Sequence, residues 1–282
     1  MTDLVLQKGK KKMEISIFDV SHGFCAYLIA DNRNVMLFDC GHNERTGFCP
    51  SSYLLSNGCT GIEHLIIQNF DQDHVSDLPN VLERFPITLF FRNQSIAPDQ
   101  LQMLKENTGP ITTAMATAIN MHRNYVCPIQ TPPPFPNIEF ENFYNQYPTF
   151  SDTNNLSLVS FIHYDGIGII FPGDIEKAGW QELLKNTSFC NHLCRTNIFV
   201  ASHHGRVNGY CEDVFNYCKP DIVIISDKEI THETQKQTYA KHVSGVLWNG
   251  GPEKRYVLTT RSDGMIHIKK NFNEGYHITI NL

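Results

Sequence analysis

The sequence contains no long uninterrupted run of apolar residues. A membrane-spanning helix needs about 20 of them in succession, so the chain of 282 residues is not expected to cross a membrane. Its first residues, MTDLVLQKGKKK, carry their basic side chains after a short apolar stretch, the reverse of the order in a secretory signal. The lysines indicate a flexible, solvated segment at about 1–12. The chain is therefore expected neither to span a membrane nor to carry a secretory signal, and its cysteine pattern predicts a cytoplasmic protein.

Disulfide spacing and an excess of positive charge are also lacking. The nine cysteines are odd in number and scattered, which suits a reducing compartment. In CNHLC, Cys190, His192 and Cys194 have the spacing of half a zinc site, but no matching second pair follows, which favours a structural role. The net charge of −6 argues against a broad electrostatic grip on nucleic acid, although a local metal site can still act on phosphates.

What the sequence does contain is a series of short apolar runs rich in β-branched and aromatic residues. Helices are expected between them at about 76–84, 98–122, 175–186, 211–218 and 233–244. Strands dominate first and then alternate with helices, which favours a layered α/β fold with helices covering sheets. We expect one domain over 13–282. Within it, the proline-rich and aromatic segment at about 95–150 is interpreted as an insertion or lid.

Polar side chains follow several of the predicted strands where each strand ends. They are Asp39, the cluster Asp71, Asp73 and His74, then Asp174, and finally His203 with His204. Several of these groups are expected to converge on one side of a sheet. Burying so many carboxylates together is prohibitive unless a cation is present. The pattern therefore predicts a metal centre, and two divalent ions bridged by a carboxylate would generate hydroxide near neutral pH.

The motifs that carry these residues resemble those of the metallo-β-lactamase superfamily: DQDH after an apolar strand, FPGDIE and SHHG. ISIFDVSHGFCAYLI is similar to the DVGQGD strand and turn of its ComEC-like branch, which includes the nuclease domain of a DNA-uptake channel protein. NNLSLV, GDIEKAG and TTRSDGMIHI are similar to later signatures of that branch. The resemblance covers about 14–270 apart from 95–150. It implies an αββα sandwich, two mixed sheets face to face with helices outside.

Carried over by position, the family pattern His-x-Asp-x-Asp-His falls on Asn69, Asp71, Asp73 and His74. Asn69 thus stands where the first metal ligand is normally His. Two interpretations are open. Either Asn69 supplies a carbonyl oxygen, as in a one-zinc subgroup that resembles this chain, or the first site is lost. A retained second site would consist of Asp73, His74, Asp174 and one of His203 or His204.

Other positions near the implied site depart from the family or have secondary roles. Phe24 replaces an Asp of the DVGQGD turn, and Ser76-Asp77 replaces a Gly-Gly pair. His22 either approaches the metals and substrate or is a structural histidine. Asn154 or Asn155 falls where related enzymes place a further His, and either completes the first site or caps a strand.

Two further residues complete the predicted site. Asp39 is expected to orient ligands from outside the coordination sphere. His232 matches a family His near the substrate mouth and is a candidate proton donor or phosphate contact.

The ligand types favour Mn²⁺ or Mg²⁺ at least as much as Zn²⁺, because oxygen donors outnumber imidazoles. The resemblance implies a hydrolase with one or two divalent ions. The leading hypothesis is a nuclease or phosphodiesterase that attacks DNA or RNA with metal-bound hydroxide, with Asp73 and His232 as its catalytic residues. Hydrolysis of a cyclic nucleotide or other small ester, and a non-catalytic binding protein with a partly lost metal site, are the alternatives. A protein partner that activates the enzyme or presents its substrate is compatible with all three, and no motif identifies one.

Overall fold

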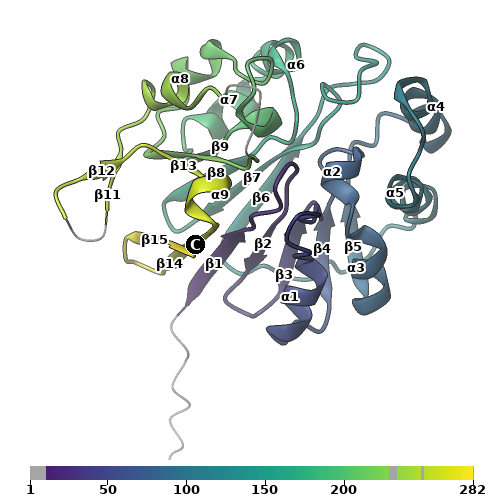
Figure 1. The fold of residues 1–282 in the computed structure, drawn as a ribbon, viewed down its shortest axis with the longest axis horizontal. Helices are drawn as coiled ribbons and strands as arrows, with labels where there is room; N and C mark the ends of the chain where they lie inside the picture. Colours follow the sequence, from purple (N-terminus) through teal and green to yellow (C-terminus); the bar gives the residue numbers. More distant parts are fainter. Residues whose placement is uncertain (1–10, 229–233, 249–250, 282) are drawn as a thin grey trace, which may run out of the picture.

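The computed structural model describes residues 11–228, 234–248 and 251–281. They form two large mixed sheets with helices on both outer faces (Figure 1). This arrangement confirms the αββα sandwich predicted from the sequence. Among these residues, no helix combines the length and the apolar character that crossing a membrane requires.

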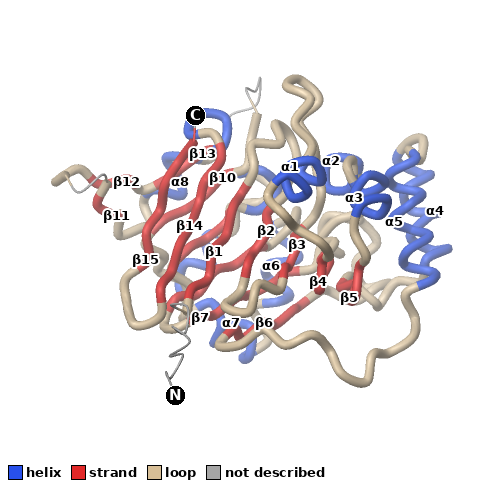
Figure 2. The backbone as a smooth tube through the Cα atoms, turned by 90° about the horizontal axis from the view of Figure 1, so that it is seen from below, coloured by secondary structure: helices blue, strands red, loops and turns tan. Residues whose placement is uncertain are grey.

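The first sheet has seven strands, which Figure 2 shows side by side. Their spatial order is β15 (Tyr276–Asn281), β14 (Met265–Asn271), β1 (Lys12–Ile17), β2 (Ala26–Ile29), β3 (Val35–Phe38), β4 (Ile62–Ile66) and β5 (Ile87–Phe91). The strands from β15 to β3 pair antiparallel, while β3, β4 and β5 run parallel. The carboxyl ends of these parallel strands therefore lie at the same edge of the sheet.

The second sheet has six strands and the same mixed character. Its order is β13 (Val257–Thr259), β10 (Ile222–Ile225), β9 (Ile198–Val200), β8 (Ile167–Phe171), β7 (Val159–Tyr164) and β6 (Ile138–Phe143). The neighbours β8, β9, β10 and β13 run parallel, whereas β7 pairs antiparallel with both β6 and β8. A separate two-stranded ribbon consists of β11 (Val246–Leu247) and β12 (Lys254–Arg255).

Helices cover the outer face of each sheet. On the first sheet and at its edge lie α1 (Pro50–Ser56), α2 (Gln72–Val75), α3 (Leu78–Arg84), α4 (Pro98–Thr108) and α5 (Thr113–Asn124). The second half of the chain adds α6 (Lys177–Leu183), α7 (Thr187–Leu193), the 3₁₀ helices η1 (Ser202–Gly205) and η2 (Glu212–Asn216), α8 (Lys236–Ala240) and α9 (Thr260–Asp263).

Three apolar layers explain why the strands are apolar on both faces. In β4 and just beyond it, Leu65 and Ile67 pack toward the helices, whereas Ile66 packs between the sheets. Successive strand side chains point to opposite faces, so a strand covered on both sides must be apolar at every position. On the second sheet Phe161 and Ile170 face α6 and α7, where Trp180 and Phe189 complete the third layer.

The structure differs from the expected elements in several places. The expected helix at 98–122 is two helices, because Gly109-Pro110 ends α4 and Thr112 caps α5 by accepting from the Met115 backbone N–H. The segment 211–218 contains a short 3₁₀ helix instead of an α-helix.

The expected terminal and inserted segments also take specific places. Of the N-terminal segment 1–12, residues 1–10 lie outside the described part, and β1 begins at Lys12. In the segment 95–150, α4 packs on α5, α5 packs on α2 and α3, and β6 forms the edge of the second sheet.

Candidate metal centre

The site lies where the carboxyl ends of the parallel strands in the two sheets meet. The short helix α2, which follows β4, carries Asp73 and His74, and the loop after β8 carries Asp174. Gln68 ties the two sheet ends together, because its side-chain amide donates to the carbonyls of Leu158 and Phe171 at 2.9 and 2.5 Å. Groups that are a hundred residues apart in the chain thereby reach one point.

Four side chains converge there with ligand atoms that all lie within 4.8 Å of one another: Asp73, His74, Asp174 and His204. His74 Nε2 is 3.1 Å from Asp174 Oδ2. His204 Nε2 is 3.3 Å from Asp73 Oδ2 and 3.6 Å from Asp174 Oδ1. Three of the four are buried, and Asp73 is half-buried at the outer side of the cluster.

The two imidazole rings are oriented by hydrogen bonds at their other nitrogens. His74 Nδ1 lies 2.7 Å from Oδ2 of Asp39, which is fully buried and also accepts from the Gln68 backbone N–H. His204 Nδ1 lies 3.1 Å from the carbonyl oxygen of Ser226. Each ring therefore presents Nε2 to the carboxylates, which is the arrangement of metal-binding histidines.

The donor set fits a divalent cation. Within the described chain, His74 Nε2 and His204 Nε2 are buried nitrogens with no hydrogen-bond partner. Burial lowers the pKa of His204, but Asp174 and Asp73 outweigh this effect and raise it to about 9. The pKa of Asp174 is held well below its usual range, because His74 and His204 outweigh its burial. The buried carboxylate of Asp174 and the half-buried one of Asp73 thus require positive charge, which a divalent ion would supply in place of two ring protons.

Close backbone packing holds the segment that bears Asp73, the helix α2. A side-chain carbon on Gly23 or Gly41 would lie 2.1 or 2.2 Å from the Asp73 carbonyl oxygen, so only glycine fits at these positions. The Phe24 backbone N–H donates to that oxygen at 3.3 Å, and the Phe24 ring packs in the core near Phe171. Phe24, which departs from the family turn, therefore supports the loop from the core.

The Ser76-Asp77 departure has a structural role as well. The Ser76 hydroxyl accepts from the His42 backbone N–H at 2.9 Å. Asp77 accepts from the Ser51 backbone N–H at 2.8 Å and from the Asn80 side chain at 2.7 Å. These bonds connect the site loop to the start of α1 and to α3.

The structure separates the two adjacent histidines that the sequence left equivalent. Both have left-handed backbone conformations, with φ of 49° at His203 and 55° at His204. His204 joins the cluster, whereas His203 Nδ1 lies 3.4 Å from Glu176 Oε1 and its Nε2 lies 3.3 Å from Arg206. His203 is therefore not among the four converging residues.

The other residues expected beside the metal have distinct places. The His22 ring packs against the His204 ring, with centroids 4.4 Å apart and planes tilted by 48°, and its Nε2 is 3.5 Å from Asp73 Oδ2. Burial, with His204 next, lowers the pKa of His22 to about 4. The Asn155 side chain accepts from the backbone N–H groups of Glu176 and Gly179, so it caps the start of α6. His232 lies outside the described residues.

Asn69 and Asp71 point to a different partner, Lys105 from α4. The Lys105 ammonium is 2.6 Å from Asp71 Oδ1, 2.8 Å from the Thr153 hydroxyl and 3.5 Å from Asn69 Oδ1. Its side chain is completely buried. Burial lowers the pKa of Lys105, and Asp71 opposes this shift. Sequence reasoning missed Lys105, although its position four residues after the buried Leu101 on one helix face was a usable signal.

A cavity of about 230 Å³ opens beside Asp73. His22, His42, Lys228 and Glu44 line it. Arg206 stands at the same side of the centre, 2.9 Å from His22 Nε2. The cluster is thus accessible from one side through an opening that carries cationic groups.

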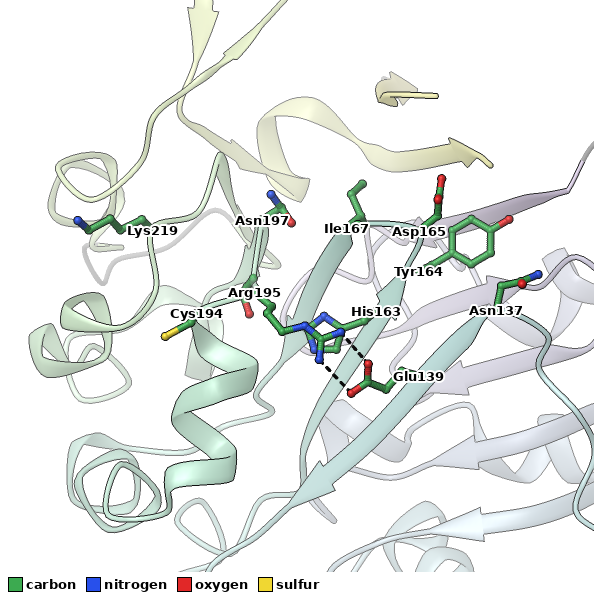
Figure 3. A pocket seen from close by; sticks show the side chains of 12 residues that line it. Asn137, Glu139, His163, Tyr164, Asp165, Ile167, Cys194, Arg195, Asn197 and Lys219 are labelled. Carbon is green, nitrogen blue, oxygen red and sulfur yellow. Dashed lines mark hydrogen bonds and ion pairs between the residues drawn. The ribbon is translucent and has the colours of Figure 1, made fainter. Parts of the chain in front are cut away.

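A larger hollow of about 510 Å³ lies at the opposite ends of the same strands (Figure 3). Ile167, the first residue of β8, lines it, whereas Asp174 follows the other end of that strand. Its Arg195 guanidinium is paired with Glu139 at 2.7 and 3.1 Å, as the dashed lines show. We therefore place the chemistry at the smaller cavity beside Asp73.

Comparison with known proteins agrees with this architecture. No protein-family model matches the chain. It is 26% identical over 217 residues to ComE operon protein 3 of Bacillus subtilis (strain 168), a match that covers 72% of this chain and 26% of that protein. The chain thus spans about a quarter of the length of this relative.

Solved structures with 10% sequence identity show the fold alone. A mutant form of CmlA β-hydroxylase superposes with a TM-score of 0.50 at 10% identity, over 93% of this chain and 54% of that one. A diphosphatase from the PhnP family matches 95% of this chain and 100% of its own, with a TM-score of 0.44 and 10% identity. The chain has the metallo-β-lactamase fold and resembles the ComEC-like branch of that superfamily.

Proposed function

We propose that this metallo-β-lactamase-fold chain is a metal-dependent phosphodiesterase whose substrate is a nucleic acid or a nucleotide. The observation that carries the proposal is the cluster of Asp73, His74, Asp174 and His204, whose two imidazole Nε2 atoms are buried without hydrogen-bond partners among the described residues. A divalent ion bound there would lower the pKa of a water molecule and polarise a phosphoryl oxygen.

Different groups of the chain would bind the ion and accept the proton. His74, Asp174 and His204 are buried and would hold the ion together with one oxygen of Asp73, while Asp39 and the Ser226 carbonyl fix the two rings. The Asp73 carboxylate faces the cavity and is the group placed to accept a proton from an attacking water. Two imidazoles with two carboxylates suit Zn²⁺ or Mn²⁺ better than Mg²⁺.

Cationic groups around the opening support an anionic substrate. Lys228 lines the cavity together with Glu44, and the guanidinium of Arg206 lies 2.9 Å from Nε2 of His22, another lining residue. In a chain of net charge −6, cations gathered at the mouth of an acidic site are suited to bind a phosphate. The guanidinium of Arg206 has the planar fork that fits two phosphate oxygens.

A second candidate, hydrolysis of a cyclic nucleotide or another small ester, is favoured by the size of the cavity. Its volume of about 230 Å³ is below the usual range for sites that enclose a whole drug-sized ligand. Such a cavity accommodates one small ester, or a single phosphodiester of a longer strand that extends over the surface.

The test is phosphodiester hydrolysis by protein loaded with Mn²⁺ or Zn²⁺, with bis(p-nitrophenyl) phosphate, single-stranded DNA, RNA and cyclic nucleotides as substrates. We expect Asp174→Ala to lose the bound ion and at least about 10²-fold in rate. The control Asp99→Ala changes an exposed carboxylate that pairs with Arg123 and should retain both. Cleavage of cyclic nucleotides alone would favour the second candidate. Hydrolysis that is unaffected by Asp174→Ala would overturn the proposal.

A further inference from the structure

The ammonium of Lys105 lies in a polar pocket that has the properties of a cation site. Three oxygens face it, Asp71 Oδ1 at 2.6 Å, Thr153 Oγ1 at 2.8 Å and Asn69 Oδ1 at 3.5 Å. The lysine side chain has no exposed surface. A buried ammonium needs an anionic partner and a full set of acceptors, and this pocket supplies both.

Two of the three acceptors, Asn69 and Asp71, are the residues that the family resemblance assigned to a first metal position. Asn69 also donates to Asn154 Oδ1 at 3.1 Å, so its amide is held by hydrogen bonds on both sides. Asp71 and Asn69 thus direct oxygens to the ammonium and not to the four-residue cluster. A second divalent ion would need the same oxygens and would be repelled by a positive charge beside it.

The helical segment that carries Lys105 is anchored against the site loop. The Thr112 hydroxyl, at the start of α5, donates to the Gln72 side chain in α2. Helices α4 and α5 pack on each other, and α5 packs on α2 and α3. The packed helix pair α4 and α5 therefore holds Lys105 in place. The role of this part of the segment 95–150 is to position the ammonium beside Asp71 and Asn69.

We propose that Lys105 is a built-in cation that takes the place of a first metal ion, so that the centre binds a single divalent ion at Asp73, His74, Asp174 and His204. The inference rests on the proposed function in one respect, that the four-residue cluster binds an ion. Lys105 is a positioning residue, because its ammonium is enclosed and its contacts fix Asp71 and Asn69. The fixed single positive charge of the Lys105 ammonium thereby replaces the double positive charge of a second, exchangeable metal ion.

The test is the stoichiometry and electronic state of Mn²⁺ bound to the full chain, measured by elemental analysis and electron paramagnetic resonance with Mn²⁺ alone as the probe. We expect one ion per chain with a mononuclear signal in the unsubstituted protein and in Asn69→His. Lys105→Ala combined with Asn69→His should raise the content to two ions and give an exchange-coupled signal. The matched control is Lys270→Met, which removes another buried lysine, paired with Asp165 away from the centre, and should retain one ion.

The outcomes separate this inference from the proposed function. Two ions in the unsubstituted protein, or in Asn69→His with Lys105 intact, would overturn the role of Lys105 and leave the metal centre standing. A folded double variant that still binds one ion would also overturn it. If the double variant does not fold, the stoichiometry of the unsubstituted protein and of Asn69→His decides. If the protein binds no Mn²⁺, or binds it equally well without Asp174, the metal centre itself would be overturned.

Discussion

The Nδ1 atom of His74 lies 2.7 Å from Oδ2 of Asp39, and both side chains are buried. This contact turns His74 Nε2 toward Asp174, 3.1 Å away. Asp39 is itself held by the Gln68 backbone N–H at 2.7 Å and has a left-handed backbone, with φ of 53°. The orientation of the His74 ring is therefore set by the fold.

The first prediction concerns this orienting contact. Asp39→Asn removes the anionic acceptor at Nδ1, so His74 loses both its fixed orientation and part of its basicity. We expect the Kd for Mn²⁺ or Zn²⁺ to rise about 10–100-fold, measured by isothermal titration calorimetry. Asp99→Asn, at an exposed ion pair, is the control and should leave the Kd unchanged. Equal affinity of Asp39→Asn and the unsubstituted protein would show that the contact does not orient a ligand.

The second prediction compares the two adjacent histidines. His204→Ala removes an Nε2 that lies 3.3 Å from Asp73, and we expect it to lower the bound metal to a small fraction of one ion per chain. His203→Ala removes a ring that contacts Glu176 and Arg206, and should retain the ion. Elemental analysis of both variants, purified identically, measures the difference. Loss of metal in His203→Ala with retention in His204→Ala would reverse the ligand assignment.

The third prediction concerns the glycine beneath the Asp73 loop. In Gly41→Ala the new methyl carbon would lie 2.2 Å from the Asp73 carbonyl oxygen, so the loop must move. We expect a loss of about 1–3 kcal/mol in the free energy of unfolding together with weaker metal binding. Gly275→Ala is the control, because no heavy atom lies within 4 Å of its added carbon. Chemical denaturation and metal titration of both variants provide the measurements, and equal behaviour would contradict the close packing.

The fourth prediction is a pH dependence of stability that originates away from the centre. His64 lies among Phe91, Phe135 and Phe140, and burial lowers its pKa to about 4. The folded state thus keeps the ring neutral, while the unfolded chain takes up a proton below pH 6.5. The stabilisation from the neutral ring is complete above pH 6.5 and is lost as the pH falls to about 4, by up to about 3 kcal/mol.

Denaturant unfolding of His64→Leu from pH 7 to pH 4 checks this prediction. The variant should lose less stability over that interval than the unsubstituted protein, because it has no ring to protonate. His277→Leu, at an exposed position of β15, serves as the control and should follow the unsubstituted protein. An unchanged slope in His64→Leu would show that His64 is not the group responsible.

The sequence by itself determined the layered fold and most of the centre. Apolar strands such as 65–67 must be covered on both faces, and polar groups directly after parallel strands must meet at one edge. These local rules predicted a layered α/β fold with helices covering sheets, and the resemblance to the metallo-β-lactamase superfamily implied the two packed sheets. They also pointed to Asp73, His74 and Asp174, which the structure brings together.

Only the tertiary structure decided between residues that are adjacent or remote in the chain. His203 and His204 are neighbours, and their backbone geometry after β9 sends one ring to the cluster and the other to Glu176. Lys105 is 34 positions from Asp71, and no periodic pattern specifies that α4 places the two in contact. Strand and helix periods fix which face a side chain occupies, whereas helix docking fixes which distant group it meets.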